Sequence, residues 1–154
     1  MKDFLKKYGE DNAELQKSRA KVTQLEAKLR DMPQAEIVMR HYFAGGVYAR
    51  EMFAPAGTVA VGKIILVDNI ANISQGEVSI QTEDGVVRVK APYQWIATAG
   101  TRRAAYFHTD TVWTVYVATE STDPVEAEAE CTAESYDDPR VLALDAKKQI
   151  RGNA

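Results

Sequence analysis

The segment PAGTVAVGKIILVDNIANISQG, residues 55–76, opens a longer stretch of short alternating runs that continues to Trp113. Single glycines separate these runs, at Gly57, Gly62, Gly76, Gly85 and Gly100. The strand candidates, with no helical pattern between them, are 58–65, 70–74, 77–82, 86–90, 93–97, 103–108 and 112–118. Short strands at such even spacing indicate an antiparallel sandwich or barrel, so the chain is predicted to be mainly β.

Two further strands and two turns extend this pattern. Ile37, Met39, His41 and Phe43 share one face of a strand with a period of two, and 47–53 follows across the turn Gly45-Gly46. Asp84-Gly85, between apolar runs at 78–80 and 86–89, is the clearest hairpin signal in the chain.

The N-terminal segment 1–32 predicts one long helix, because it is rich in Lys, Glu, Gln, Ala and Leu and ends before Pro33. Apolar residues recur along it at alternating spacings of four and three, which is typical of a coiled coil. The predicted oligomer seam contains Leu15, Val22, Leu25, Leu29 and Met32. The alternative is an amphipathic helix that lies on its own domain. Pairing between subunits is favoured, as a dimer or a trimer.

The C-terminal part has a different composition. Eight carboxylates and no Lys or Arg lie between Glu120 and Asp138, and this acidic run is interpreted as a solvated face. Asp123-Pro124 suits a helix start, so 124–131 is either a short helix or an edge strand. A brief helical pattern occupies 140–154. The expected units are therefore an oligomerising helix (1–32), a β-barrel (35–120) and an acidic segment with a tail (121–154).

The bulk composition excludes several classes. The sequence of 154 residues has 45% hydrophobic and 27% charged residues, as expected for one globular domain with an appended element. No apolar run is long enough for a transmembrane helix, and the charged N-terminus is not a secretory signal. The net charge of −3 argues against direct nucleic-acid binding, and the single cysteine excludes an internal disulfide. No membrane partner is expected.

The glycine spacing over about 45–118 resembles the cupin superfamily, whose barrel usually holds a metal ion. The first cupin signature is a glycine, five residues, His-x-His, three or four residues, Glu, six residues and a glycine. Gly57, Lys63-Ile64-Ile65, Asn69 and Gly76 stand at those intervals. The second signature places a glycine, a Pro-x-Gly turn, a histidine and an asparagine, where this chain has Pro92, Thr98-Ala99-Gly100, Arg103 and Phe107. The resemblance implies a jelly-roll barrel.

The four positions that would hold the metal carry the wrong chemistry. They are Lys63, Ile65, Asn69 and Arg103, whereas transition metals bind imidazole and carboxylate groups. His41 and His108 lie outside these positions and are interpreted as surface histidines or histidines with a hydrogen-bond partner. The sequence therefore predicts no metal ion, no other cofactor and no catalytic residue.

A metal-free barrel could still bind a ligand. Lys63 and Arg103, with Tyr93 and Tyr106, are candidates for a pocket that takes a carboxylate, a phosphate or a sugar phosphate. The alternative is that the two cations point outward or pair with Glu77 or Glu83. Trp95 and Trp113, with Tyr93 and Tyr116, are interpreted as residues that fill the barrel.

The segments 41–58 and 91–106 are similar to small cupin-like proteins encoded in tailed bacteriophage genomes, and Val47-Tyr48-Ala49-Arg50-Glu51 belongs to that likeness. The resemblance implies a phage origin. We therefore expect a non-enzymatic virion protein, such as a head or tail decoration or connector subunit, located in the virion and in the host cytoplasm before assembly. Its partners would be copies of itself and other virion proteins. The alternatives are a metal-independent ligand-binding cupin and, third, a sugar-nucleotide isomerase or epimerase.

Overall fold

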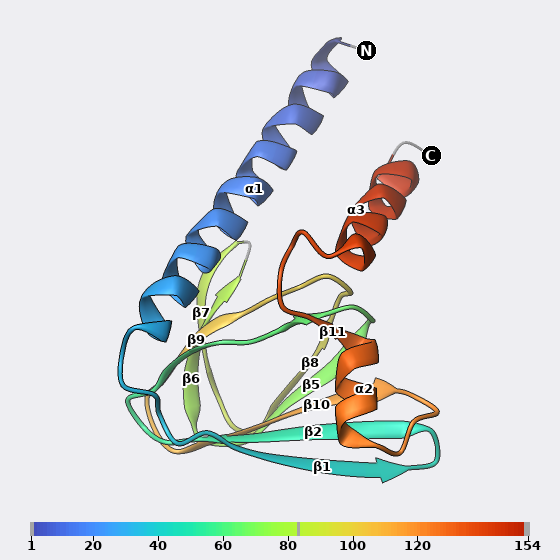
Figure 1. Cartoon of the computed structure of the whole chain (residues 1–154). Coiled ribbons are helices and arrows are strands. Elements are labelled where there is room, and N and C mark those ends of the chain that lie inside the picture. Colours follow the sequence, from blue (N-terminus) through green and yellow to red (C-terminus); the bar gives the residue numbers. More distant parts are fainter. Residues whose placement is uncertain (1, 83, 153–154) are drawn as a thin grey trace.

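A computed structural model describes residues 2–82 and 84–152 of the chain, which fold as two packed antiparallel sheets flanked by helices (Figure 1). The helices are α1 (Lys2–Arg30), α2 (Pro124–Cys131) and α3 (Pro139–Gly152). The strands are β1 (Val38–Ala44), β2 (Val47–Ala54), β3 (Val59–Val61), β4 (Ile64–Ile65), β5 (Asn69–Gln75), β6 (Glu77–Thr82), β7 (Gly85–Lys90), β8 (Tyr93–Ala97), β9 (Ala104–Phe107), β10 (Thr111–Ala118) and β11 (Thr132–Ala133).

The strand pairing is that of a jelly roll. Along the chain, β2 pairs with β10, β3 with β9, β5 with β8, and β6 with β7, so the antiparallel pairs are nested one inside the next. This wrapping produces one large sheet in the order β1-β2-β10-β5-β8 and a second in the order β3-β9-β6-β7, and β4 pairs with β11 in a separate two-stranded sheet. Two sheets with such nested connections define the jelly roll. Within the described residues, no strand pairing joins these two sheets into a closed barrel.

The strands lie close to the positions that the period-two patterns of the sequence predict. Met39, His41 and Phe43 alternate with exposed neighbours along β1, and β1 pairs with β2 across the turn Gly45-Gly46. The hairpin between β6 and β7 is confirmed as well, with Gly85 at a φ of 113°. The single broad strand expected at 58–65 is interrupted at residues 62–63, between β3 and β4.

One glycine of the repeating pattern is required by close packing. Gly76 lies between β5 and β6 with a φ of 96°, a backbone conformation that residues with a side chain rarely adopt. A Cβ atom there would collide with Thr111 and with the carbonyl oxygen of Asp110. Because β10 begins at this point, the glycine allows the turn to pass directly over the start of that strand.

The sequence pattern of 124–131 is compatible with a short helix or an edge strand, and the structure has a helix there. The Asp123 carboxylate accepts hydrogen bonds from the backbone N–H groups of Val125 and Glu126, which caps the first turn of α2. Ala127 and Cys131, one turn apart, are buried against the jelly roll. The tail also forms a helix, α3, over most of the expected range.

The main core lies between the two sheets. Its buried members are Ala54, Ile73, Val78, Ile80, Val89, Ala105 and Phe107. Trp95 and Trp113 pack on this cluster from the interior, as predicted, with their ring centroids 5.4 Å apart. The prediction for Tyr116 is wrong, because this side chain is 38% exposed on the outer face. Residues 113 and 116 are an odd number of positions apart, so they point to opposite faces of β10.

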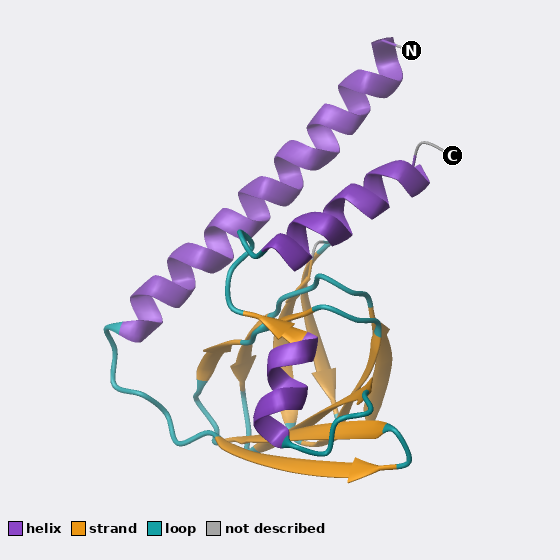
Figure 2. Cartoon of the chain, turned by 45° about the vertical axis from the view of Figure 1, so that its right-hand side comes forward, coloured by secondary structure: helices purple, strands orange, loops and turns teal. Residues whose placement is uncertain are grey.

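Helix α1 runs beside α3 and contacts its own jelly roll (Figure 2). Arg19 forms a two-fold hydrogen-bonded ion pair with Asp145 of α3, at 2.7 and 2.9 Å. Glu26 pairs with Arg102, which precedes β9, at 2.6 Å. Val22, midway between these contacts, is buried. Part of the helix therefore lies on its own domain, which was the alternative interpretation.

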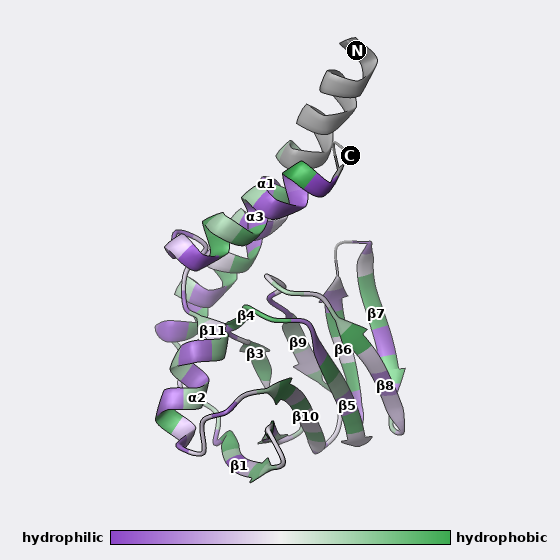
Figure 3. Ribbon diagram, turned by 90° about the vertical axis from the view of Figure 1, so that its right-hand side faces the viewer, coloured by the Kyte–Doolittle hydropathy of each residue, from purple (hydrophilic) through white to green (hydrophobic). Residues whose placement is uncertain are grey.

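The structure of the single chain shows no coiled coil within the described residues, and the predicted seam is divided. Val22 is buried, Leu15, Leu25 and Leu29 are partly buried, and Met32 lies beyond the helix end with 56% exposure. Polar and apolar residues are mixed along α1 and α3 (Figure 3). Seam positions in residues 2–12 lie where side chains are not described. Pairing of α1 between subunits stays a prediction.

Candidate functional site

A cavity of about 280 Å³ lies inside the jelly roll and is lined by both large sheets. Its walls follow the strand alternation, since residues at every second position point inward. Arg103, Ala105 and Phe107 supply one wall from β9 and the residues before it. The remaining lining is mostly apolar: Ile37, Met39, Met52, Ala60, Val61, Gly62, Ala71, Trp95, Ala97, Thr101, Trp113 and Val115.

All four residues at the metal-ligand positions of the cupin pattern line this cavity. They are Lys63 and Ile65 at β4, Asn69 at the start of β5, and Arg103 directly before β9. The glycine spacing in the sequence therefore indicated residues that converge in space, although none of them is a histidine or a carboxylate.

These residues do not fit a transition metal. Lys63 brings a cation that already forms an ion pair, and Ile65 has no donor atom. Asn69 offers one amide oxygen, while its amide nitrogen donates to the carbonyl oxygens of Val67 and Ala97. No group of three or more His, Cys, Asp or Glu side chains suited to a metal occurs among the described residues. Among the described residues, the cavity lining therefore lacks the three converging ligands that a transition metal needs.

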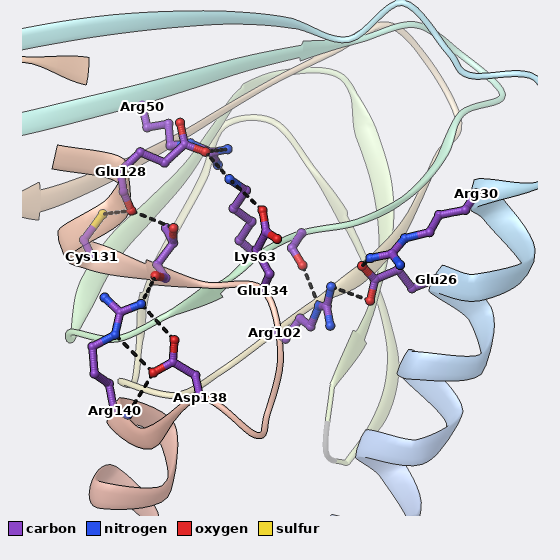
Figure 4. Close-up of polar contacts among 12 residues, drawn as sticks. Glu26, Arg30, Arg50, Lys63, Arg102, Glu128, Cys131, Glu134, Asp138 and Arg140 are labelled. Carbon is purple, nitrogen blue, oxygen red and sulfur yellow. Dashed lines mark hydrogen bonds and ion pairs between the residues drawn. The ribbon is translucent and has the colours of Figure 1, made fainter. Parts of the chain in front are cut away.

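One end of the cavity is held by an ion-pair network from α2 (Figure 4). The Glu128 carboxylate lies 2.7 Å from the Lys63 ammonium and 3.3 Å from an Arg50 guanidinium nitrogen, both through Oε1. Glu134 is a more distant partner of Lys63, at 3.7 Å, and is 79% exposed. The Glu128 side chain is only 24% exposed. Two partly buried cations, Arg50 and Lys63, therefore share one partly buried carboxylate at the cavity edge.

The environment keeps Glu128 ionised. Burial alone would raise its pKa, but the hydrogen bond from Lys63 and the charges of Arg50 and Lys63 outweigh burial and hold the pKa below its usual value. A carboxylate in this state is a poor proton donor near neutral pH. It serves better as a fixed counter-ion than as a general acid.

Three polar groups around the cavity lack partners within the described residues. The Asn69 side-chain oxygen and the Arg50 Nε atom are buried and make no hydrogen bond. The partly buried Arg103 side chain also lines the cavity, and it makes no hydrogen bond or ion pair with any residue that the structure describes. Arg103 also lines a groove of about 410 Å³ beneath α1, so it stands between the cavity and that groove. Buried polar atoms without a partner are uncommon in folded proteins, so the Asn69 oxygen and the Arg50 Nε atom require an explanation, which a bound molecule would supply.

The structure places two of the four predicted pocket residues in the cavity. Lys63 and Arg103 line it, whereas Tyr106 is 43% exposed and belongs to the opposite face of β9. Tyr93 is 41% exposed at the start of β8, where its ring contacts Trp95 from outside the lining. Tyr106 is three residues from Arg103, and this odd separation sends the two side chains to opposite faces.

The alternative for Lys63 and Arg103 was that they point outward or pair with Glu77 or Glu83, and the structure decides part of this. Lys63 pairs with Glu128, not with Glu77, because Glu77 accepts from Arg88 at 3.0 Å. Glu83 lies outside the described residues. The prediction of partnered histidines is confirmed, since a ring nitrogen of His41 lies 2.6 Å from the Tyr48 hydroxyl and one of His108 lies 2.7 Å from the Ser79 hydroxyl.

Sequence reasoning missed Arg50 and Glu128. Arg50 shares the inward face of β2 with Tyr48 and Met52, so the alternation could have placed it in the interior. Glu128 was included in the solvated acidic run. The buried pair Ala127 and Cys131 flanks it, but the sequence carries no direct signal that Glu128 reaches a cation 65 positions earlier.

Comparison with known proteins gives structural likeness only. The sequence matches no protein-family model, and no curated protein matches it. Among solved structures, the neighbours include cupin-superfamily proteins. A cupin domain from Bordetella pertussis is 14% identical over 57% of this chain and 98% of its own, with a TM-score of 0.45. A cupin-superfamily protein from Desulfitobacterium hafniense is 12% identical over 58% and 84%, with a TM-score of 0.48.

An acetylacetone dioxygenase from Acinetobacter johnsonii is 14% identical with a TM-score of 0.46. The match covers 55% of this chain and 61% of the dioxygenase, so this chain spans less than two thirds of that protein. Likeness at this level transfers no activity. Within the described residues, no helix is long and apolar enough to cross a membrane.

Proposed function

We propose that the protein is a non-enzymatic binding protein whose cupin-like jelly roll takes a small organic molecule into its cavity without a transition metal. The observation that carries this proposal is the convergence of Lys63, Ile65, Asn69 and Arg103 on one apolar cavity. Pockets for small ligands are mostly apolar with a few convergent polar groups, and this cavity has that composition.

The state of the ionisable groups supports binding without catalysis. The lining contains three cations and no carboxylate, and the neighbouring Glu128 is held as a counter-ion. General acid–base chemistry needs a group that can exchange a proton near the working pH. Glu128 is shifted in the opposite direction, because Lys63 and Arg50 favour its charged form.

The two tryptophans make this proposal testable. Trp95 and Trp113 are the only tryptophans of the sequence and both line the cavity, so intrinsic fluorescence reports on its occupancy. Titration with the neutral probe phenethyl alcohol should produce a saturable change. Ala97→Leu fills part of the cavity and should weaken binding about tenfold or more, because the probe and the added methyl groups cannot share that space. Ala118→Leu, the same change at an exposed site of β10, should leave it unaltered. No saturable change in the wild-type protein would contradict the proposal.

A second candidate is the assembly role in a phage particle. A row of neighbouring, exposed apolar side chains crosses all five strands on the outer face of the larger sheet, and this row favours a docking role. Its members are Tyr42 (51% exposed), Tyr116 (38%), Ile70 (44%) and Ile96 (76%), with the partly buried Ala49 between Tyr42 and Tyr116. Mass spectrometry of purified particles would find the protein if this role is correct, and its absence from them would contradict it.

The assembly role also requires copies to associate through α1. Replacing Leu25 and Leu29 with Lys places charges in the apolar seam, and an intersubunit helix pair would then dissociate. Light scattering should report a smaller species than the wild type, and Leu142→Lys on exposed α3 is the control. An unchanged mass would show that α1 does not hold the oligomer.

A further inference from the structure

We infer that the cavity selects a molecule with one negative charge at the end of a compact apolar body, and that Arg103 receives this charge. This inference rests on the proposed binding function and names its ligand class. The class would include aryl and short alkyl monocarboxylates, which combine an apolar group with a single carboxylate.

The apolar part of the cavity sets the size and shape of the body. Trp95, Trp113 and Phe107 form consecutive edge contacts, with ring centroids 5.4 and 6.4 Å apart. All three belong to the lining, and the volume of about 280 Å³ leaves room for one ring with a short substituent. Aromatic edges and faces contact an aromatic guest favourably, so a ring fits this end better than a polyhydroxylated sugar.

The charges around the opening set the ligand's charge. Arg50, Lys63 and Arg103 line the cavity, and its lining contains no carboxylate. Glu128 pairs with both Arg50 and Lys63, at 3.3 and 2.7 Å, and Glu134 lies 3.7 Å from Lys63, so two carboxylates balance these two cations. Arg103 has no such partner among the described residues, so one guanidinium remains to be paired at the edge of an apolar space.

A guanidinium in that position discriminates between ligand charges. It can donate two parallel hydrogen bonds to a carboxylate, and this pairing is strong where water is partly excluded. A neutral ligand leaves Arg103 unpaired, and an amine is repelled by all three cations. A dianion would need a second uncompensated cation, yet Arg50 and Lys63 are already balanced by Glu128 and Glu134. One negative charge is therefore the best complement.

The test compares four probes that carry the same ring: phenylacetate, phenethyl alcohol, phenethylamine and phenylmalonate. Tryptophan fluorescence of the full-length protein measures each dissociation constant. Phenylacetate should bind at least about tenfold more tightly than phenethyl alcohol, and phenethylamine should bind most weakly. Phenylmalonate should bind less tightly than phenylacetate, because its second charge finds no free cation.

Variants then assign the preference to Arg103. Arg103→Met should reduce phenylacetate binding to about the level at which the same variant binds phenethyl alcohol, and saturable binding of the alcohol by this variant would show that the cavity still forms. Arg103→Lys should keep part of the preference, because the charge remains without the two-fold geometry. Arg88→Met removes an exposed cation of β7 outside the cavity and should change nothing.

The outcomes separate this inference from the proposed function. Equal binding of phenylacetate and phenethyl alcohol by the wild type would overturn the charge selection while the binding function stands. A preference that persists in Arg103→Met would overturn the assignment to Arg103. If no probe changes the fluorescence, both the inference and the binding function are contradicted.

Discussion

The two faces of the five-stranded sheet each depart from the usual distribution of side chains at a few positions. The inner face includes Arg50 and Asn69, whereas the outer face carries exposed Tyr116, Ile70 and Ile96. Interiors of folded proteins normally exclude unpaired polar groups, and charged residues normally cover surfaces. This difference supports the proposals that the interior of the jelly roll is a binding site as well as a core and that its outer face contacts another surface.

The largest difference between the faces should appear in stability. Trp113→Ala removes an aromatic ring that packs on Trp95 and Phe107, and a loss of about 3 kcal/mol in unfolding free energy is expected. Tyr116→Ala, three residues along the same strand, should cost about 1 kcal/mol or less because that ring is partly in solvent. Urea unfolding of both variants measures the contrast. Equal losses would show that the outer row is already packed against something in solution.

A smaller loss of stability, which depends on pH, is expected when the ion pair between Glu128 of α2 and the cavity cations is removed. The folded-state pKa of Glu128 is lowered by Lys63 and Arg50, so its contribution to stability is present above the unfolded carboxyl pKa of about 4.3 and is lost as pH falls through the folded value. Glu128→Gln should therefore be less stable than the wild type at pH 7, and the gap should narrow below about pH 4.

The matched control for that measurement is Glu126→Gln, an exposed carboxylate on the same helix. Its stability should follow the wild type much more closely across the pH range, because it has no ion pair with the cavity cations. A pH-independent gap for Glu128→Gln would mean that the carboxylate acts through its shape, and the counter-ion role would have to be abandoned.

The strand pattern made most of the jelly roll predictable. Alternation placed β1, β2 and the β6–β7 hairpin, and the glycine intervals indicated the four residues that meet at the cavity. The interior positions of Trp95 and Trp113 also followed from this pattern. These features depend on residues near one another in the chain, where backbone geometry and period-two burial dominate.

Features that depend on distant partners were not predictable in the same way. Glu128 meets Arg50 across 78 positions, and Arg19 meets Asp145 across 126. Such charge pairs form only because the fold brings their segments together. The local composition around Glu128 carries no sign of this partner, and an acidic run of that kind predicts a solvated face. The placement of Tyr106 and Tyr116 is a different case, because counting positions along β9 and β10 would have assigned both to the outer face.

The most direct test of the metal-independent site is elemental analysis combined with binding. Protein purified without chelator should contain well under one zinc, iron or manganese ion per chain, since Lys63, Ile65, Asn69 and Arg103 cannot supply the ligands. Its affinity for phenethyl alcohol, measured by tryptophan fluorescence, should be the same before and after treatment with a chelator. Stoichiometric metal, or binding that disappears with the chelator, would contradict the account.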